Sequence, residues 1–174
     1  MRDKIVGMIH KILHYILLSA LGTTYLLAND VVEHKKLPLS ISLPYLETIE
    51  DKALTIGNGP VKVFVFIDPL CPHSQNFMSL IYESKKMQAR YSYYLFLYAL
   101  PRFHSERVVS AIYATKNPLD ALVDLMIFKK KIKDSVLLED KSSVVMIADV
   151  AQKIDVYKRP YLIMVKPENK KREK

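Results

Sequence analysis

The feature that most constrains the fold is the apolar run Val61–Ile67, with the sequence VKVFVFI. It is rich in β-branched and aromatic residues and has the length of one strand. Because its apolar residues are continuous rather than alternating, both faces of such a strand must be covered, as in a sheet with helices on each side. The sequence therefore predicts an α/β protein with this run as a central strand.

The segments after this run alternate between helix and strand patterns. Helices are expected at 72–90, 105–114, 119–130 and 142–154, and strands at 91–100 and 161–165. Such alternation predicts a sheet with right-handed crossovers. Before the run, Asn58-Gly59-Pro60 predicts a turn, and Pro38 and Pro44 are expected to interrupt the preceding segment.

The amino end carries a membrane signal. Residues 12–28 are almost entirely apolar and follow Arg2, Lys4 and Lys11. About 17 residues is the shortest span of a bilayer and also fits a secretory signal, so the segment is either an uncleaved anchor or a signal cleaved after Ala28. An amphipathic core helix is the remaining alternative. The basic residues before the span predict a cytoplasmic amino end and a domain outside.

The predicted organisation thus has four parts. Residues 1–28 form the anchor or signal, 29–55 a tether with a short element leading into the domain, 56–165 the folded domain, and 166–174 a basic tail. The net charge of +8 comes largely from the two ends and from Lys129, Lys130, Lys131 and Lys133. A topology signal and a solvated tail explain these charges, so no nucleic-acid partner is expected.

The composition also limits cofactors. The chain has four Gly and no glycine-rich phosphate motif, which argues against a nucleotide site. Its one cysteine cannot close an internal disulfide, and the five His show no metal-ligand spacing around it. No metal or cofactor is therefore expected.

Cys71 is the candidate reactive group, at the point where the apolar strand passes into a helix that begins with Pro72. Unpaired N–H groups at a helix start favour a thiolate, which is the attacking form of cysteine. His73 can add positive charge nearby when it is protonated. The competing interpretation is that Cys71 is simply a small buried apolar residue.

Four segments resemble one known family. VFVFIDPLCPHSQNF (63–77) resembles the active-site strand and helix of periplasmic thiol:disulfide interchange proteins of the DsbC/DsbG type. Residues 94–102 are similar to the family's strand ending in Phe-Pro-Arg, 110–118 to its following helix and loop, and 155–160 to the approach to its cis-proline. The resemblance implies a thioredoxin-like fold with a helical insertion over about 55–165. It also implies that Pro160 is cis and faces Cys71, with Arg159 bordering the site.

The sequence departs from this family in three ways. Ser74 stands where the second cysteine of the CxxC motif belongs, and a hydroxyl cannot resolve a mixed disulfide. Residues 29–55 are too few for the family's dimerisation domain, so a monomer is expected. After Val165 the sequence offers only KPENKKREK in place of a final strand and helix, so one sheet edge is expected to be open.

Two functions are consistent with these residues. The first is an extracytoplasmic monothiol protein that acts on protein thiols by mixed-disulfide chemistry: disulfide shuffling, removal of a thiol adduct, or reduction of a sulfenic acid. Its catalytic residues would be Cys71, His73 and Pro160, with Pro72, Ser74 and Arg159 in binding roles, and an external thiol or membrane reductant as partner. It would lie on the periplasmic side of the inner membrane, or free in the periplasm. The second is a catalytically degenerate module that binds an envelope partner or an unfolded chain.

Overall fold

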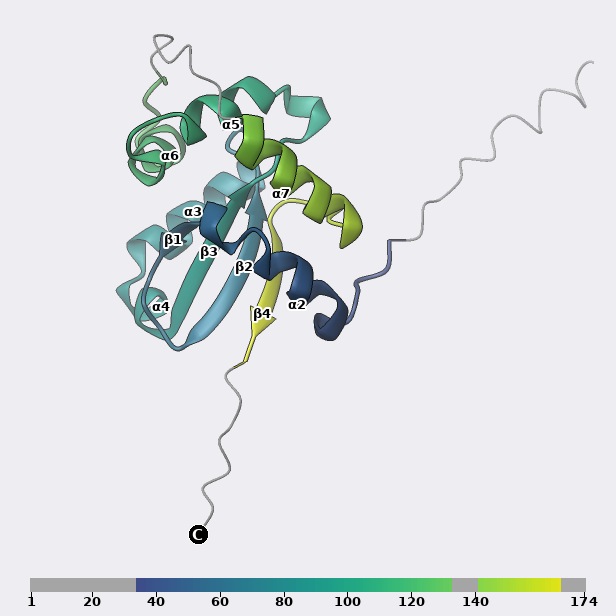
Figure 1. Ribbon diagram of the computed structural model, residues 1–174. Coiled ribbons are helices and arrows are strands. Elements are labelled where there is room, and N and C mark those ends of the chain that lie inside the picture. Colours follow the sequence, from purple (N-terminus) through teal and green to yellow (C-terminus); the bar gives the residue numbers. More distant parts are fainter. Residues whose placement is uncertain (1–33, 133–140, 167–174) are drawn as a thin grey trace, which may run out of the picture. The chain divides into compact units, whose positions relative to one another are not determined.

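A computed structural model describes residues 34–132 and 141–166. Within these residues the centre is a four-stranded sheet in the order β1-β3-β2-β4 (Figure 1). The strands are β1 (Leu54–Ile56), β2 (Val61–Ile67), β3 (Tyr91–Leu97) and β4 (Tyr161–Val165). β2 and β3 are parallel, whereas β1 pairs with β3 and β4 pairs with β2 in antiparallel orientation. The carboxyl ends of β2 and β3 and the start of β4 therefore meet at one edge of the sheet.

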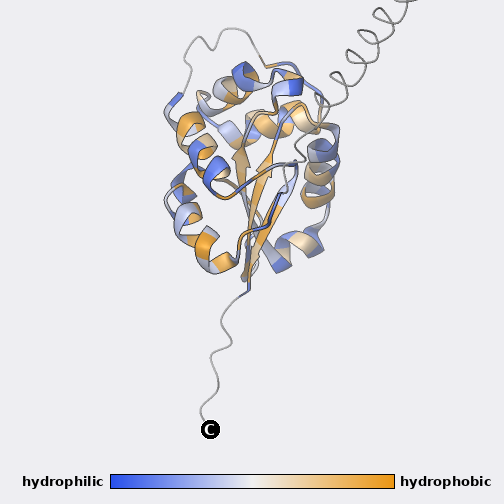
Figure 2. Ribbon diagram, turned by 90° about the vertical axis from the view of Figure 1, so that its right-hand side faces the viewer, coloured by the Kyte–Doolittle hydropathy of each residue, from blue (hydrophilic) through white to orange (hydrophobic). Residues whose placement is uncertain are grey.

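Helices cover both faces of this sheet (Figure 2). One face carries α3 (Pro72–Glu83), α5 (Glu106–Tyr113) and α6 (Pro118–Met126), which pack against the odd-numbered residues of β2. The other carries α2 (Leu39–Glu47) and α7 (Lys141–Lys153), which pack against Phe64 and Phe66. Residues Val63–Ile67 are buried, which confirms the prediction of a central strand covered on both sides.

The helical insertion lies between β3 and β4. It consists of α5, α6 and α7, which agree with the helices expected at 105–114, 119–130 and 142–154 to within four residues at every end. β4 coincides with the strand expected at 161–165. Among the described residues, β4 has no strand on its outer side, and its side chains Leu162 and Met164 are 38% and 47% exposed.

The helix expected at 72–90 is divided in two. α3 ends at Glu83, and α4 (Lys85–Arg90) begins after Ser84, whose backbone is extended. The Ser84 hydroxyl accepts a hydrogen bond from the Met87 N–H and caps α4. The Gln88 side chain donates to the Ile81 and Tyr82 carbonyls at the end of α3. The two helices therefore satisfy each other's ends where one continuous helix was expected.

The segment expected to be a tether contains part of the core. Pro44 was expected to interrupt it, but this proline lies inside α2. Leu46 and Ile49, the latter just before the short 3₁₀ turn η2 (Glu50–Lys52), are fully buried against β2 and α7. Burial of these side chains offsets the hydrogen bond that Pro44 cannot donate. Residues 39–56 thus pack as α2, η2 and β1 on the sheet.

The predicted turn before β2 needs its glycines. Gly57 has φ +84°, a left-handed conformation that side chains disfavour. A Cβ on Gly59 would collide with the backbone of Arg90 and Tyr91. The turn at 57–60 therefore holds β2 close to the start of β3.

No helix in residues 34–132 and 141–166 combines the length and apolarity that crossing a bilayer requires. The anchor or signal expected at 12–28 lies outside these residues, as does nearly all of the basic tail expected at 166–174.

Candidate functional site

Cys71 is the N-cap residue of α3, at the sheet edge where β2 ends. A turn places it there: the Cys71 N–H donates to the Asp68 carbonyl at 3.1 Å, and the Gln75 N–H donates to the Cys71 carbonyl at 3.0 Å. Pro72 occupies the first helical position, where its missing N–H costs no hydrogen bond. Pro72 and His73 are both exposed on this first turn.

The loop before β4 lies against Cys71. The Cys71 sulfur is 4.0 Å from the Arg159 carbonyl oxygen. This contact joins residues that are 88 positions apart in the chain. The peptide bond between Arg159 and Pro160 is cis. The Cys71 side chain is fully buried beneath its surroundings. A reagent or substrate therefore reaches this sulfur only when part of the cover moves.

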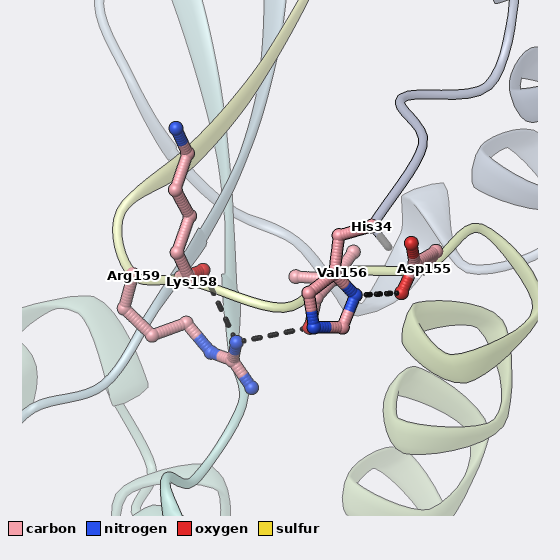
Figure 3. Close-up of polar contacts among 5 residues, drawn as sticks. All are labelled: His34, Asp155, Val156, Lys158 and Arg159. Atoms are coloured by element: carbon pink, nitrogen blue, oxygen red, sulfur yellow. Dashed lines mark hydrogen bonds and ion pairs between the residues drawn. The ribbon is translucent and has the colours of Figure 1, made fainter. Parts of the chain in front are cut away.

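Arg159 borders Cys71 through its carbonyl oxygen, and its side chain is buried, with 8% of the residue's surface exposed. Its Nε donates to the Tyr98 carbonyl at 3.0 Å, and its Nη1 donates to the Val156 and Lys158 carbonyls at 3.1 Å. The guanidinium carbon also lies 3.8 Å from the centre of the Tyr98 ring. Figure 3 shows the guanidinium turned back towards the carbonyls of its own loop.

The buried guanidinium has an unusual electrostatic setting. Burial lowers the pKa of Arg159, while Tyr98, Asp68 and Cys71 act in the opposite direction. Its hydrogen bonds go to the carbonyl oxygens of Tyr98, Val156 and Lys158. The guanidinium is therefore a buried cation whose electrostatic interactions include one with Cys71.

The same loop is also held from its outer side. The His34 ring stacks on the Tyr157 ring at 4.3 Å, and its Nδ1 lies 2.8 Å from Asp155 Oδ1 (Figure 3). The segment leading into α2 thus contacts the loop that covers Cys71.

Asp68 is the residue that the sequence analysis left without a role. Its carboxylate is fully buried and accepts hydrogen bonds from the Leu70 N–H at 2.8 Å, the Leu100 N–H and the Ser105 hydroxyl. These donors belong to the turn before Cys71 and to the connection between β3 and α5. Asp68 therefore ties together two of the segments around Cys71. The only sequence signal was an acidic residue directly after a buried strand.

Ser74 is buried on the inner side of α3, and its hydroxyl accepts a hydrogen bond from the Asp68 N–H at 3.2 Å. The position expected for a second cysteine thus faces the protein interior. The structure brings Cys71, Ser74 and the Arg159–Pro160 loop together, and leaves the His73 ring exposed without a hydrogen bond to another described residue. Among residues 34–132 and 141–166, no three His, Cys, Asp or Glu side chains gather as metal ligands do.

No protein-family model and no curated protein matches the sequence. Solved structures do match. A disulfide interchange protein from Neisseria gonorrhoeae is 24% identical over 66% of this chain and 80% of its own, with a TM-score of 0.54. BcfH of Salmonella enterica Typhimurium is 13% identical over 96% of this chain and 85% of its own, with a TM-score of 0.57. The thiol-disulfide exchange protein alpha-DsbA2 from Wolbachia pipientis is 12% identical over 72% and 86%, with a TM-score of 0.51.

The chain has a thioredoxin-like fold. The structural likeness at identities of 24% and below shows the fold alone. The activity depends on the residues of the site.

Removing the Asp68 carboxylate tests its role at the site. Asp68→Ala is expected to lower the free energy of unfolding by at least about 2 kcal/mol, because three donors lose their acceptor in a buried place. Asp51→Ala is the matched control, since this exposed aspartate makes only a surface pair with Lys52 and should cost less than about 1 kcal/mol. Urea denaturation followed by circular dichroism measures both, and equal losses would contradict the assigned role.

Proposed function

We propose that this chain acts on protein thiols through mixed disulfides formed at Cys71. The observation that carries the proposal is the contact between the Cys71 sulfur and the Arg159 carbonyl, which sets the loop of Pro160 over the start of α3. The Cys71 thiol lies at the start of α3 and interacts with the buried Arg159 guanidinium. Two of the similar solved structures are titled as disulfide interchange or thiol-disulfide exchange proteins, which agrees with this chemistry.

The proposed reaction uses one sulfur. The Cys71 thiolate attacks a substrate disulfide, a Cys71–S–S–substrate bond forms, and the other substrate sulfur leaves as a thiolate. A second thiol then attacks the mixed disulfide and regenerates the Cys71 thiolate. If that thiol belongs to the substrate, the disulfide has moved without net oxidation. If it belongs to an external thiol compound, a second external thiol completes reduction of the substrate.

Ser74 decides which of these outcomes is accessible. Its hydroxyl accepts the Asp68 N–H and has no sulfur with which to release a bound substrate. Release therefore depends on a thiol from outside the site, which separates this protein from CxxC reductases. A closer relationship to the DsbC/DsbG type rests on the sequence segments described above and remains part of the proposal.

A second candidate function has one observation in its favour. Cys71 is fully buried, as a cysteine that only packs the core would be. A thioredoxin-like domain with an unreactive cysteine could still bind an envelope partner through the loop before β4. The two functions differ in whether Cys71 of the folded protein reacts with a disulfide.

Adduct formation tests the first function against the second. Oxidised glutathione is expected to give one adduct on Cys71 that persists after the reagent is removed, detected by intact-protein mass spectrometry. Ser74→Cys should shorten the adduct's lifetime, because a sulfur at this buried position next to Asp68 can attack the mixed disulfide. Ser79→Cys adds a thiol elsewhere on α3 and should leave the lifetime unchanged. A folded wild-type protein that forms no adduct would favour the binding module.

We also propose that residues 12–28 hold the domain at the outer face of the inner membrane. The basic residues Arg2, Lys4 and Lys11 before this apolar run support that orientation. Protease added to intact bacterial spheroplasts is expected to degrade the domain, while a cytoplasmic marker protein survives. Degradation only after lysis would place the domain inside.

A further inference from the structure

Hydrogen bonds and close contacts join four chain segments around Cys71. Asp68 binds the connection after β3, through Leu100 and Ser105. The Lys129 ammonium donates to Gln75 Oε1 at 2.8 Å. This hydrogen bond holds the segment after α6 against the first turn of α3. The loop before β4 approaches through the Arg159 carbonyl. Residues on these segments therefore form the rim of the site.

Three of these segments each carry an exposed cation. Arg102 follows β3 in the short turn η3 (Pro101–Phe103), Lys129 follows α6, and Lys158 precedes Arg159, and all three are exposed. Within the described residues none of the three makes an ion pair with a carboxylate. Each is adjacent in sequence to an aromatic residue: Phe103, Phe128 and Tyr157 respectively.

Most carboxylates on the same segments are already engaged. Asp68 is buried with three donors, Asp124 pairs with Lys130, and Asp155 contacts His34. Glu106 at the start of α5 and Asp120 in the first turn of α6 are the exceptions. Other acids lie on other parts of the chain. Glu50 pairs with Lys62 near the start of β2, and Glu83 is the last residue of α3. On these segments, exposed cations without an ion pair therefore outnumber such carboxylates.

We propose that this rim, Arg102, Lys129 and Lys158, selects protein substrates whose reactive cysteine is flanked by acidic residues. The inference rests on the proposed function. A polypeptide that forms a disulfide with Cys71 must place one of its own cysteines at this site. Side chains next to that sulfur meet three exposed cations on separate segments. The cations attract carboxylates at these positions and repel lysines. The exposed rings of Phe128 and Tyr157 add apolar contact for the bound polypeptide.

The test uses two disulfide-linked peptides of equal length, one with Glu and one with Lys on both sides of its cysteine. The rate constant for mixed-disulfide formation with Cys71 is measured for each and divided by the rate for a small uncharged disulfide. The Glu peptide is expected to react about tenfold faster than the Lys peptide at low ionic strength, and the difference should shrink at high salt.

Charge reversal identifies the residues responsible. Arg102→Glu, Lys129→Glu and Lys158→Glu together are expected to invert the preference for the Glu peptide. Lys85→Glu, Lys86→Glu and Lys116→Glu together change the net charge equally but lie on other segments, so the preference should remain. If the rim triple variant does not fold, as judged by circular dichroism, Lys158→Glu alone should reduce the preference.

The outcomes separate this inference from the proposed function. Equal rates for the two peptides, with normal reaction of the uncharged disulfide, would overturn the acidic preference and leave the thiol chemistry standing. No reaction with any disulfide would overturn both. Binding to phosphatidylglycerol vesicles or to an oligonucleotide that depends on the rim, together with equal peptide rates, would assign the cations to that other partner and also overturn the inference.

Discussion

The geometry of the site depends on the hydrogen bonds that the buried carboxylate of Asp68 accepts. It lies directly after the central strand and receives donors from Leu70, Leu100 and the Ser105 hydroxyl. A buried carboxylate is costly unless hydrogen bonds replace its water, so these donors must stay in place for the fold to be stable. Their positions fix the turn that presents Cys71 and the connection that begins the basic rim. Ser74 joins the same network through the Asp68 N–H.

The sequence predicted the parts of this fold that depend on continuous patterns. The apolar run at 61–67 allowed only a strand covered on both faces, and the glycine turn before it and the helices after it followed from local signals. Local signals failed where tertiary contacts prevailed. Pro44 lies within a helix because Leu46 and Ile49 are buried on the sheet, and the helix expected at 72–90 stops where Ser84 caps a second helix.

The sequence predicted which segments meet at Cys71 but not the contacts between them. Cys71 at a strand-to-helix junction and the loop at Arg159–Pro160 could be paired because they resemble a known arrangement. The inward turn of the Arg159 side chain could not be predicted, since it depends on Tyr98, which lies 61 residues earlier in the chain. Asp68 was missed because its donors, at 70, 100 and 105, gather only in the folded chain.

Burial of Cys71 beside a cation makes its accessibility the central question. The account requires that the cover formed by the Arg159–Pro160 loop opens while the rest of the domain stays folded. The most direct test is the rate at which a small uncharged thiol reagent labels Cys71 over a series of low urea concentrations. If the loop opens locally, the labelling rate is measurable without urea and almost independent of the urea concentration below the unfolding transition. A rate that rises with urea as steeply as global unfolding does would show that Cys71 is only a core residue and would contradict the account.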